Sequence, residues 1–315
     1  MVTTGQSVER RWYVVKGASP LDKAETIRQH GQASSREALS RQLRRVLMVR
    51  PEFYANTEAR NPLSRNQPPV DLPLAQRQWQ ALCASLAHIG LEVQELKPHA
   101  SLEDMCFAAS QAFVGMDRED RAFAVMARML HRSRRDEVLL FANWYAQHGY
   151  RIFDLGLADD EFLEGGDLLW NPDWQAVWAG FGHRSTRAAV DLFASVLGEL
   201  GYTVRRLELV DPYFYHLNLC LAPLTADAVL VYPGAFTPTT LATIRGSATV
   251  YEVQRQEALQ FLCNGISING YYITPLLTRR LEQILGEVGL EPVVVELSEF
   301  HKAGGSAASL VMLLP

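Results

Sequence analysis

The sequence predicts an α/β protein in which small repeats of helix and strand form a ring around a central channel. Four times an amphipathic helix ends in glycine and an apolar-alternating strand follows, at Gly90, Gly149, Gly201 and Gly289. Glycine just past a helix is a common C-cap, and the period-two pattern after it indicates a strand. Short β-like runs lie between these joints, at 122–126, 168–170, 176–181, 217–221 and 228–232. Strands therefore outnumber helices, which favours a ring of small blades.

A doubly wound parallel sheet is the alternative architecture. It requires long parallel strands and a glycine fingerprint for phosphate, and no G-x-G-x-x-G follows a strand in this sequence. A fifth, divergent copy of the repeat is expected in a helix over 254–262, which runs through Asn264 and Gly265 into a strand over 266–273. One such unit cannot bury its own apolar face, so neighbouring copies must pack together.

Composition excludes several classes of partner. The chain has 315 residues, 48% of them hydrophobic, and a net charge of −5. No tract of Lys and Arg is interleaved with aromatic residues, so we expect no nucleic-acid partner. The short basic cluster 132–135 lies beside two acidic residues and is interpreted as a solvated turn. No signal-peptide pattern and no apolar run of membrane-spanning length occurs, so we expect a cytoplasmic protein without a membrane partner.

The four cysteines, Cys83, Cys106, Cys220 and Cys263, have apolar neighbours and form no C-x-x-C pair. This favours buried, reduced thiols over disulfides or a zinc site. The histidines are scattered and form no pair at ligand spacing, so neither a metal nor another cofactor is expected.

The chain is expected to divide into an N-terminal extension, 1–43, and a single domain, 44–315. The extension is polar, with a short strand predicted at 12–15 and a helix predicted from Ser34 to Arg45. Its role is open between a lid, an oligomer arm and a partly disordered tail. Whether the chain forms a homo-oligomer is also open.

Three polar clusters lie at the ends of predicted elements. Glu164 and Asp167 flank two glycines before a strand, His216 leads into another strand, and Ser309 follows Gly304 and Gly305 before the last strand. Each has a plain structural explanation: a turn cap, an Asx-turn, a core histidine, a tight turn. Loops at corresponding ends of a ring of blades converge on its axis. Together the clusters supply a nucleophile-sized side chain, a base and an orienting carboxylate.

Five motifs follow one another in a recognisable order: 104–107 (Asp-Met-Cys-Phe), 164–167 (Glu-Gly-Gly-Asp), 182–185 (Gly-His-Arg-Ser), 214–218 (Phe-Tyr-His-Leu-Asn) and 302–309 (Lys-Ala-Gly-Gly-Ser-Ala-Ala-Ser). From residue 45 to residue 315 the chain resembles the guanidino-group-modifying amidinotransferase family, which includes dimethylarginine dimethylaminohydrolase, arginine deiminase and arginine dihydrolase. The resemblance implies a five-bladed α/β propeller (the pentein fold) with pseudo-five-fold ββαβ-type repeats.

The resemblance also implies the chemistry. In the family a cysteine thiolate attacks the guanidinium carbon, and water or an acceptor amine then takes the amidino group. His216 matches the histidine that protonates the departing amine, and Glu164 matches its carboxylate partner. The small-molecule guanidino substrate would be held by the residues that match family contacts: Asn61, Asp104, Ser110, Asp167, Arg184 and Asn218.

This sequence departs from the family at three positions, the nucleophile position and two of the substrate-contacting positions. Ser309 stands where the family has its nucleophilic cysteine, and a serine hydroxyl is far less acidic than a thiol. Either the serine was introduced to hold substrate unreacted, or the chain is a natural non-catalytic relative; retention of Glu164 and His216 favours the first. Asn218 and Ser110 replace residues that are commonly acidic or amide side chains, which suggests a modified or larger guanidino compound rather than arginine.

Three functions compete. The first is an amidinohydrolase or amidinotransferase, inactivated at position 309. The second is a binding or assembly protein on the same propeller scaffold, since fold does not dictate catalysis. The third is an unrelated αβ enzyme that uses Ser309 with His216, but no G-x-S-x-G elbow is present. Cys220 is not expected to replace the nucleophile, because a strand would place it about 13 Å from His216.

Overall fold

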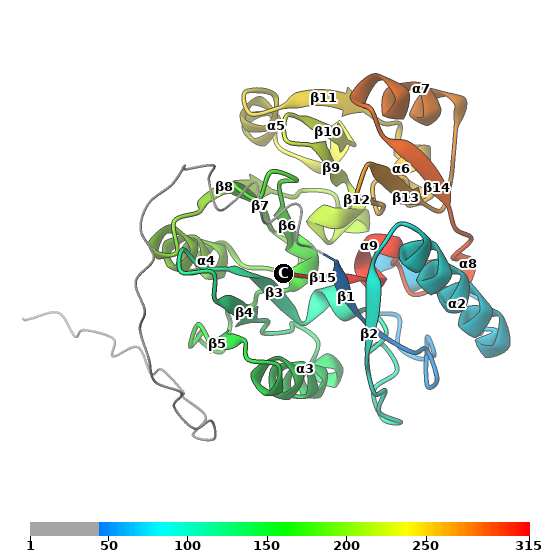
Figure 1. Ribbon diagram of the computed structural model, residues 1–315, viewed down its shortest axis with the longest axis vertical. Coiled ribbons are helices and arrows are strands. Elements are labelled where there is room, and N and C mark those ends of the chain that lie inside the picture. Colours follow the sequence, from blue (N-terminus) through cyan, green and yellow to red (C-terminus); the bar gives the residue numbers. More distant parts are fainter. Residues whose placement is uncertain (1–43) are drawn as a thin grey trace, which may run out of the picture.

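A computed structural model describes residues 44–315. Five three-stranded sheets radiate from a common centre, and the long helices lie outside them (Figure 1). The sheet orders are β15-β1-β2, β3-β4-β5, β6-β7-β8, β9-β10-β11 and β12-β13-β14. In every sheet the middle strand pairs antiparallel with one neighbour and parallel with the other, as the registers of β1 and β4 illustrate. The expected five-bladed propeller of ββαβ repeats is confirmed.

The strands are β1 (Arg45–Val49), β2 (Glu92–Leu96), β3 (Ala112–Met116), β4 (Ala122–Met126), β5 (Arg151–Phe153), β6 (Leu168–Trp170), β7 (Ala176–Phe181), β8 (Thr203–Glu208), β9 (Leu221–Thr225), β10 (Ala228–Val231), β11 (Thr249–Glu252), β12 (Ile266–Ile268), β13 (Tyr271–Thr274), β14 (Glu291–Val294) and β15 (Met312–Leu314). The helices are α2 (Leu72–His88), α3 (Arg135–Gln147), α4 (Arg187–Glu199), α5 (Pro238–Arg245), α6 (Arg255–Leu259), α7 (Arg279–Val288), α8 (Ser298–His301) and α9 (Ala307–Leu310).

The helix–glycine–strand joints are confirmed by backbone geometry. Gly90, Gly149, Gly201 and Gly289 have φ values of 88°, 82°, 92° and 75°. This left-handed conformation is costly for other residues and closes the C-terminus of a helix. Each glycine thereby turns the chain from an outer helix back into the parallel edge strand of its own blade.

The fourth blade differs from the prediction. Its helix is α5, which begins with Thr237 accepting a hydrogen bond from the Thr240 backbone N–H and with proline in its first turn. The helix expected over 254–262 shortens to α6, five residues long. The strand expected over 266–273 is a hairpin, because Asn269 and Gly270 have φ values of 52° and 84°, which suit a two-residue turn.

Two further predictions differ from the structure. One concerns the run 217–221, and the other concerns the segment that ends at Arg45. The run 217–221 is not a strand: Leu217–Leu219 forms a 3₁₀ turn, and β9 begins only at Leu221. The strand predicted at 12–15 and most of the helix predicted from Ser34 lie outside the described residues. Arg45, the expected end of that helix, opens β1 instead.

The ring is closed by pairing between distant parts of the sequence. β15 runs antiparallel to β1, with Arg45 opposite Leu314. The side chains of Val46, Leu47, Met48 and Val49 are completely buried. In Figure 1 β15 lies at the middle of the ring, so the loop that precedes it is brought to the axis.

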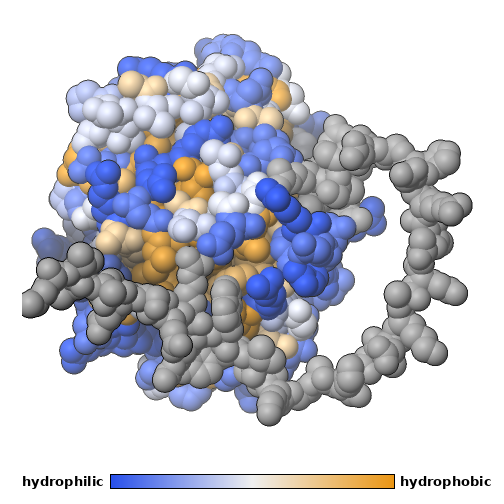
Figure 2. Space-filling model, turned by 90° about the vertical axis from the view of Figure 1, so that its left-hand side faces the viewer, coloured by the Kyte–Doolittle hydropathy of each residue, from blue (hydrophilic) through white to orange (hydrophobic). Residues whose placement is uncertain are grey.

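The outer surface is mixed in polarity. Figure 2 shows an apolar area bordered by hydrophilic residues on the side that faces left in Figure 1. An apolar groove runs between α3 and β5, lined in part by Met126, Val138, Leu139 and Leu157. Among the helices of residues 44–315, none combines the length and hydrophobicity that a membrane crossing requires.

Candidate active site

Loops from several blades meet in one small polar pocket. Its wall includes six residues singled out in the sequence: Asn61, Asp104, Ser110, Arg184, His216 and Ser309. It also includes residues not singled out there: Arg60, Phe107, Arg134 and Tyr215. The volume in which a water molecule can be centred is about 20 Å³, room for roughly one water. Distant loops therefore meet as the sequence predicted, and the pocket that they enclose is nearly closed.

Glu164 and His216 form a buried pair, and His216 lines this pocket. His216 Nε2 donates a hydrogen bond to Glu164 Oε2 over 2.8 Å. Glu164 Oε1 accepts from the Leu130 backbone N–H at 3.0 Å, and Arg184 lies 3.2 Å from Oε2. Burial opposes the charge of Glu164, yet Arg184, His216 and Arg134 together hold its pKa well below the usual range. Burial lowers the pKa of His216. At neutral pH the pair is thus a carboxylate beside a neutral imidazole.

Asp167 lies behind His216 and does not line the pocket. Its Oδ1 accepts a hydrogen bond from the Leu217 backbone N–H at 3.0 Å, and its Oδ2 contacts the Ser185 hydroxyl at 2.6 Å. The side chain is completely buried. Burial and the charge of Glu164 raise its pKa to about 8, although the contacts with Ser185 and Leu217 lower it. Asp167 therefore fixes the turn that carries His216.

Replacing Asp167 with asparagine is expected to change how stability depends on pH. The pKa of Asp167 is raised from 3.8 to about 8 on folding. Its stabilising contribution is therefore complete below about pH 4 and is lost as the pH rises through 8. An asparagine amide donates to Ser185 as the protonated acid would, but does not titrate. The free energy of unfolding of the unaltered chain should fall, relative to Asp167→Asn, between pH 4 and pH 8.

Urea unfolding at several pH values measures this difference. Glu164 and His216 titrate in both proteins, so their contributions cancel in the comparison. The exposed Asp136→Asn variant serves as the control and should show a profile parallel to that of the unaltered chain. Parallel profiles for Asp167→Asn as well would contradict the raised pKa.

Gly166 leaves the space that the imidazole occupies. A Cβ added there would lie 2.7 Å from His216 Nδ1, closer than side chains tolerate. Gly166→Ala is expected to lower the free energy of unfolding by about 1–3 kcal/mol, as overpacking does, and to displace the ring. Gly198→Ala in α4 is the matched control: nothing lies within 4 Å of its Cβ position. That variant should gain about 0.5–1 kcal/mol. Equal effects of the two variants in thermal unfolding would refute this packing argument.

Ser309 is held by Asn264 rather than by a strand. The sequence placed it at the leading end of the last strand; instead it lies in the short helical turn α9, and β15 starts three residues later. Ser309 Oγ donates to Asn264 Oδ1 at 3.1 Å, and the Ser306 backbone N–H donates to the same oxygen at 2.7 Å. Asn264 Nδ2 in turn donates to the Asn218 carbonyl at 2.9 Å. Asn264 carried no sequence signal beyond an Asn-Gly pair.

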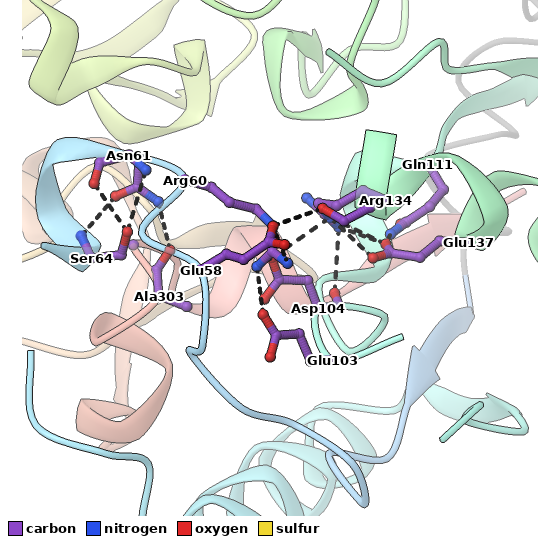
Figure 3. A network of polar contacts seen from close by, with 12 residues as sticks. Glu58, Arg60, Asn61, Ser64, Glu103, Asp104, Gln111, Arg134, Glu137 and Ala303 are labelled. Carbon is purple, nitrogen blue, oxygen red and sulfur yellow. Dashed lines mark hydrogen bonds and ion pairs between the residues drawn. The ribbon is translucent and has the colours of Figure 1, made fainter. Parts of the chain in front are cut away.

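The prediction of a solvated turn over 132–135 is wrong for Arg134. The cluster 132–135 is not wholly solvated, because the Arg134 side chain is buried and lies 2.8 Å from Glu137 Oε2. It also donates to the Asp104 carbonyl at 3.4 Å. Figure 3 shows this guanidinium between Glu137 and Asp104, with Gln111 on the far side of Glu137. Glu137 lies only three residues further along the chain, but the Asp104 loop lies 30 residues away, so the local charge pattern could not reveal that Arg134 is buried.

Asp104 faces two arginines. Its Oδ2 lies 2.9 Å from Arg60 and 3.9 Å from Arg134 (Figure 3). Burial raises its pKa to about 6, against the opposite effect of both arginines. Asp104 Oδ1 is buried and, within residues 44–315, has no hydrogen-bond partner. An acceptor thus remains available at the pocket wall.

Arg184 and Asn61 build the opposite wall. The Arg184 guanidinium carbon lies 4.5 Å from the centre of the Tyr215 ring, and the group donates to the Arg60 carbonyl at 2.8 Å. Asn61 Nδ2 donates to the Ala303 carbonyl at 2.9 Å, and Asn61 caps the 3₁₀ turn Pro62–Ser64. Both side chains therefore tie the segment around residue 60 to the rest of the site.

Asn218 and Cys220 do not reach this pocket. Asn218 lines a separate cavity on the other side of the loops. Cys220 is not on a strand with His216 but ends the 3₁₀ turn, where its buried thiol donates to the Leu217 carbonyl at 3.5 Å. Within the described chain, no three His, Cys, Asp or Glu side chains are grouped as metal ligands.

Comparisons with known proteins identify relatives. No protein-family model matches the chain. It is 34% identical over 267 residues to N(G),N(G)-dimethylarginine dimethylaminohydrolase of Mycobacterium tuberculosis, covering 84% of this chain and 83% of that protein. It is 30% identical over 272 residues to the bifunctional arginine dihydrolase/ornithine cyclodeaminase ArgZ of Synechocystis sp., covering 85% of this chain and 37% of that protein.

A solved structure agrees with these matches. The N-terminal domain of ArgZ, crystallised as a cysteine-to-serine mutant bound to substrate, superposes with a TM-score of 0.79 at 30% identity. The match covers 85% of this chain and 97% of that domain.

Proposed function

Because this chain belongs to the guanidino-group-modifying amidinotransferase family, we propose that its pocket binds a guanidino or amidino compound and that position 309 is the nucleophile position for cleavage of a C–N bond in that compound. The observation that carries the proposal is the buried Glu164–His216 pair, whose imidazole lines the same pocket as Ser309. With serine there, the chain holds its ligand with little or no turnover.

The charge of each pocket residue suggests which group of the ligand it contacts. Asp104 accepts N–H groups of the ligand's guanidinium, for which its unpartnered Oδ1 is suited. Arg184 and Arg134 line the pocket and would bind an anionic group of the ligand. Ser110 and Asn61 contribute polar contacts at the rim. Since the pocket holds about one water, its wall must open before a ligand of this size can enter.

The order in which bonds form and break follows from the protonation states of Glu164 and His216. The nucleophile at 309 forms a bond to the central amidino carbon while the imidazole takes its proton. His216, then an imidazolium stabilised by Glu164, returns that proton to the departing amine as the C–N bond breaks. Water next attacks the amidino carbon and gives one proton to His216. The bond from the amidino carbon to the residue 309 atom then breaks, and His216 returns that proton to residue 309. An amine in place of water would give amidino transfer.

Calorimetric titration of the full chain tests this proposal. Arginine, N(G),N(G)-dimethylarginine and agmatine form the panel, and citrulline is the matched control because it lacks the guanidinium charge. At least one member of the panel should bind at least about tenfold more tightly than citrulline, since a charge-assisted hydrogen bond to Asp104 is lost in citrulline. Asp104→Asn should abolish this preference. No binding by any member would count against the proposal.

The alternative is a non-catalytic protein that uses the scaffold for binding or assembly. Ser309 itself favours it, because an alkoxide is not readily formed beside a neutral imidazole. Reading the codon at position 309 in the encoding gene separates an introduced serine from a natural one. We also propose a cytoplasmic location, which the four unpaired cysteines support.

A further inference from the structure

Arg60 lies where the small polar pocket adjoins a larger cavity outside it. The outer cavity has a volume of about 320 Å³ in which a water molecule can be centred, and Glu58, Glu103 and Ser133 are in its wall. Among residues 44–315, Arg60 and Asp104 are the two that line both spaces. The ion pair between them therefore stands between the outer cavity and the candidate active site.

The guanidinium of Arg60 is held by three carboxylates. Its Nη1 lies 2.7 Å from Glu103 Oε1 and 2.9 Å from Asp104 Oδ2, and its Nη2 lies 2.9 Å from Glu58 Oε2 (Figure 3). Nε donates to Ser133 Oγ at 3.2 Å, and the side chain is 8% exposed. Carboxylates that accept the N–H groups of a planar cation are what a guanidino ligand requires. In this structure the cation that they hold belongs to the chain itself.

The three carboxylates lie on two sides of Arg60. Glu58 and Glu103 line the outer cavity, whereas Asp104 also lines the pocket that contains Ser309. The backbone at Arg60 is fixed separately, because its carbonyl accepts from the Arg184 guanidinium at 2.8 Å. Rotation of the Arg60 side chain alone would therefore release Asp104, and the outer cavity has room for the guanidinium.

We propose that Arg60 is an internal competitor for the ligand's guanidinium at Asp104. This inference rests on the proposed function and adds how the wall of the pocket opens. The incoming guanidinium replaces that of Arg60 at Asp104 Oδ2, while Arg60 turns into the outer cavity and keeps Glu58 and Glu103 as partners. A neutral ligand cannot make this exchange, because it would leave the buried Asp104 without its nearest positive charge. Arg60 thereby selects for cationic ligands.

Calorimetric titration of the unaltered chain and of Arg60→Met tests this exchange, with arginine, N(G),N(G)-dimethylarginine and agmatine as ligands. The titration is run at pH 8, because loss of Arg60 raises the pKa of Asp104 above its value of about 6. A ligand that must displace a competitor binds with reduced apparent affinity, so at least one compound should bind Arg60→Met about fivefold more tightly or better. Citrulline, which lacks the guanidinium charge, should not gain affinity.

Two further variants are matched to this comparison. Arg60→Lys keeps a positive charge and should bind the guanidino compounds less tightly than Arg60→Met does. Arg132→Met removes an exposed arginine of the neighbouring turn and should bind them as the unaltered chain does.

Two results would overturn the role of Arg60 and leave the proposed function standing. One is binding of the guanidino compounds that does not tighten in Arg60→Met. The other is an equal gain for citrulline, because Arg60 would then block space rather than compete for a charge. Absence of binding by all three compounds to both proteins would reject the proposed function as well.

An NMR measurement on the unaltered chain decides the matter if Arg60→Met does not fold. The Arg60 Nε–H signal is identified by its loss from the spectrum of Arg60→Lys. Saturation with whichever of the three guanidino compounds binds most tightly should shift this signal and speed its exchange with water, because Arg60 leaves its buried position. An unchanged signal in the ligand-bound chain would show that Arg60 stays on Asp104, against the proposal.

Discussion

Ser309→Cys is expected to raise the rate of guanidino C–N cleavage by at least about 100-fold and to yield a covalent amidino adduct. The reason is acidity: a thiol titrates near pH 8.5, and positive charges lower this further. Arg134 and Arg184 line the same pocket, and the neutral imidazole of His216 can accept the proton. Release of ammonia or amine from the panel compounds, followed over time, measures the rate.

Intact-mass spectrometry detects the adduct, and its absence from Ser309→Ala assigns it to position 309. The four native cysteines provide an internal control, since burial raises the pKa of each thiol above its ordinary value. Ser309→Ala should bind ligand without reacting, and Ser309→Cys combined with His216→Ala should lose most of the gain. A Ser309→Cys protein that binds a panel compound yet forms neither product nor adduct would leave the non-catalytic function as the better reading of this chain.

Arg134→Leu is expected to lower the free energy of unfolding by about 3–5 kcal/mol, because it leaves a buried carboxylate unpaired. Glu137 is 1% exposed and, among residues 44–315, would keep only Gln111 as a neutral side-chain partner, at 2.5 Å. Urea unfolding measures the loss. Arg132→Leu, an exposed neighbour in the same cluster, is the control and should change stability by less than about 0.5 kcal/mol.

The double variant Arg134→Leu/Glu137→Leu separates desolvation from lost packing. Removing both charges should restore a substantial part of the free energy of unfolding that Arg134→Leu loses. The reason is that most of this loss comes from burying an uncompensated carboxylate. If the double variant is as unstable as the sum of the two single variants, the pair is not coupled, and the buried ion pair is not what Arg134 contributes.

The sequence predicted the features that are encoded locally. The four glycine joints follow from helix capping, and the order of five motifs led to the propeller and to the pairing of Glu164 with His216. Helix α5 was not predicted because it has only eight residues and several threonines, which are weak helix formers. Thr237 and Pro238, a cap followed by a first-turn proline, were the available signal.

The features that escaped prediction depend on tertiary contacts. The burial of Arg134 is set by Glu137 and by a loop 30 residues away, so a charge run read locally looked solvated. The 3₁₀ turn after His216 changes which side chains face the pocket, and this directs Asn218 to the other cavity. Strand alternation could not anticipate that change, because it applies only to extended backbone.

The pairing of β1 with β15 has a kinetic consequence. Arg45 contacts the Pro315 carbonyl across 270 positions of sequence, the kind of non-local contact that slows folding. Ser309 lies just before β15, so the strand that completes the first sheet also delivers the reactive position. During refolding, capacity to bind a guanidino compound should therefore return later than helical content, and the two should recover with separable time courses.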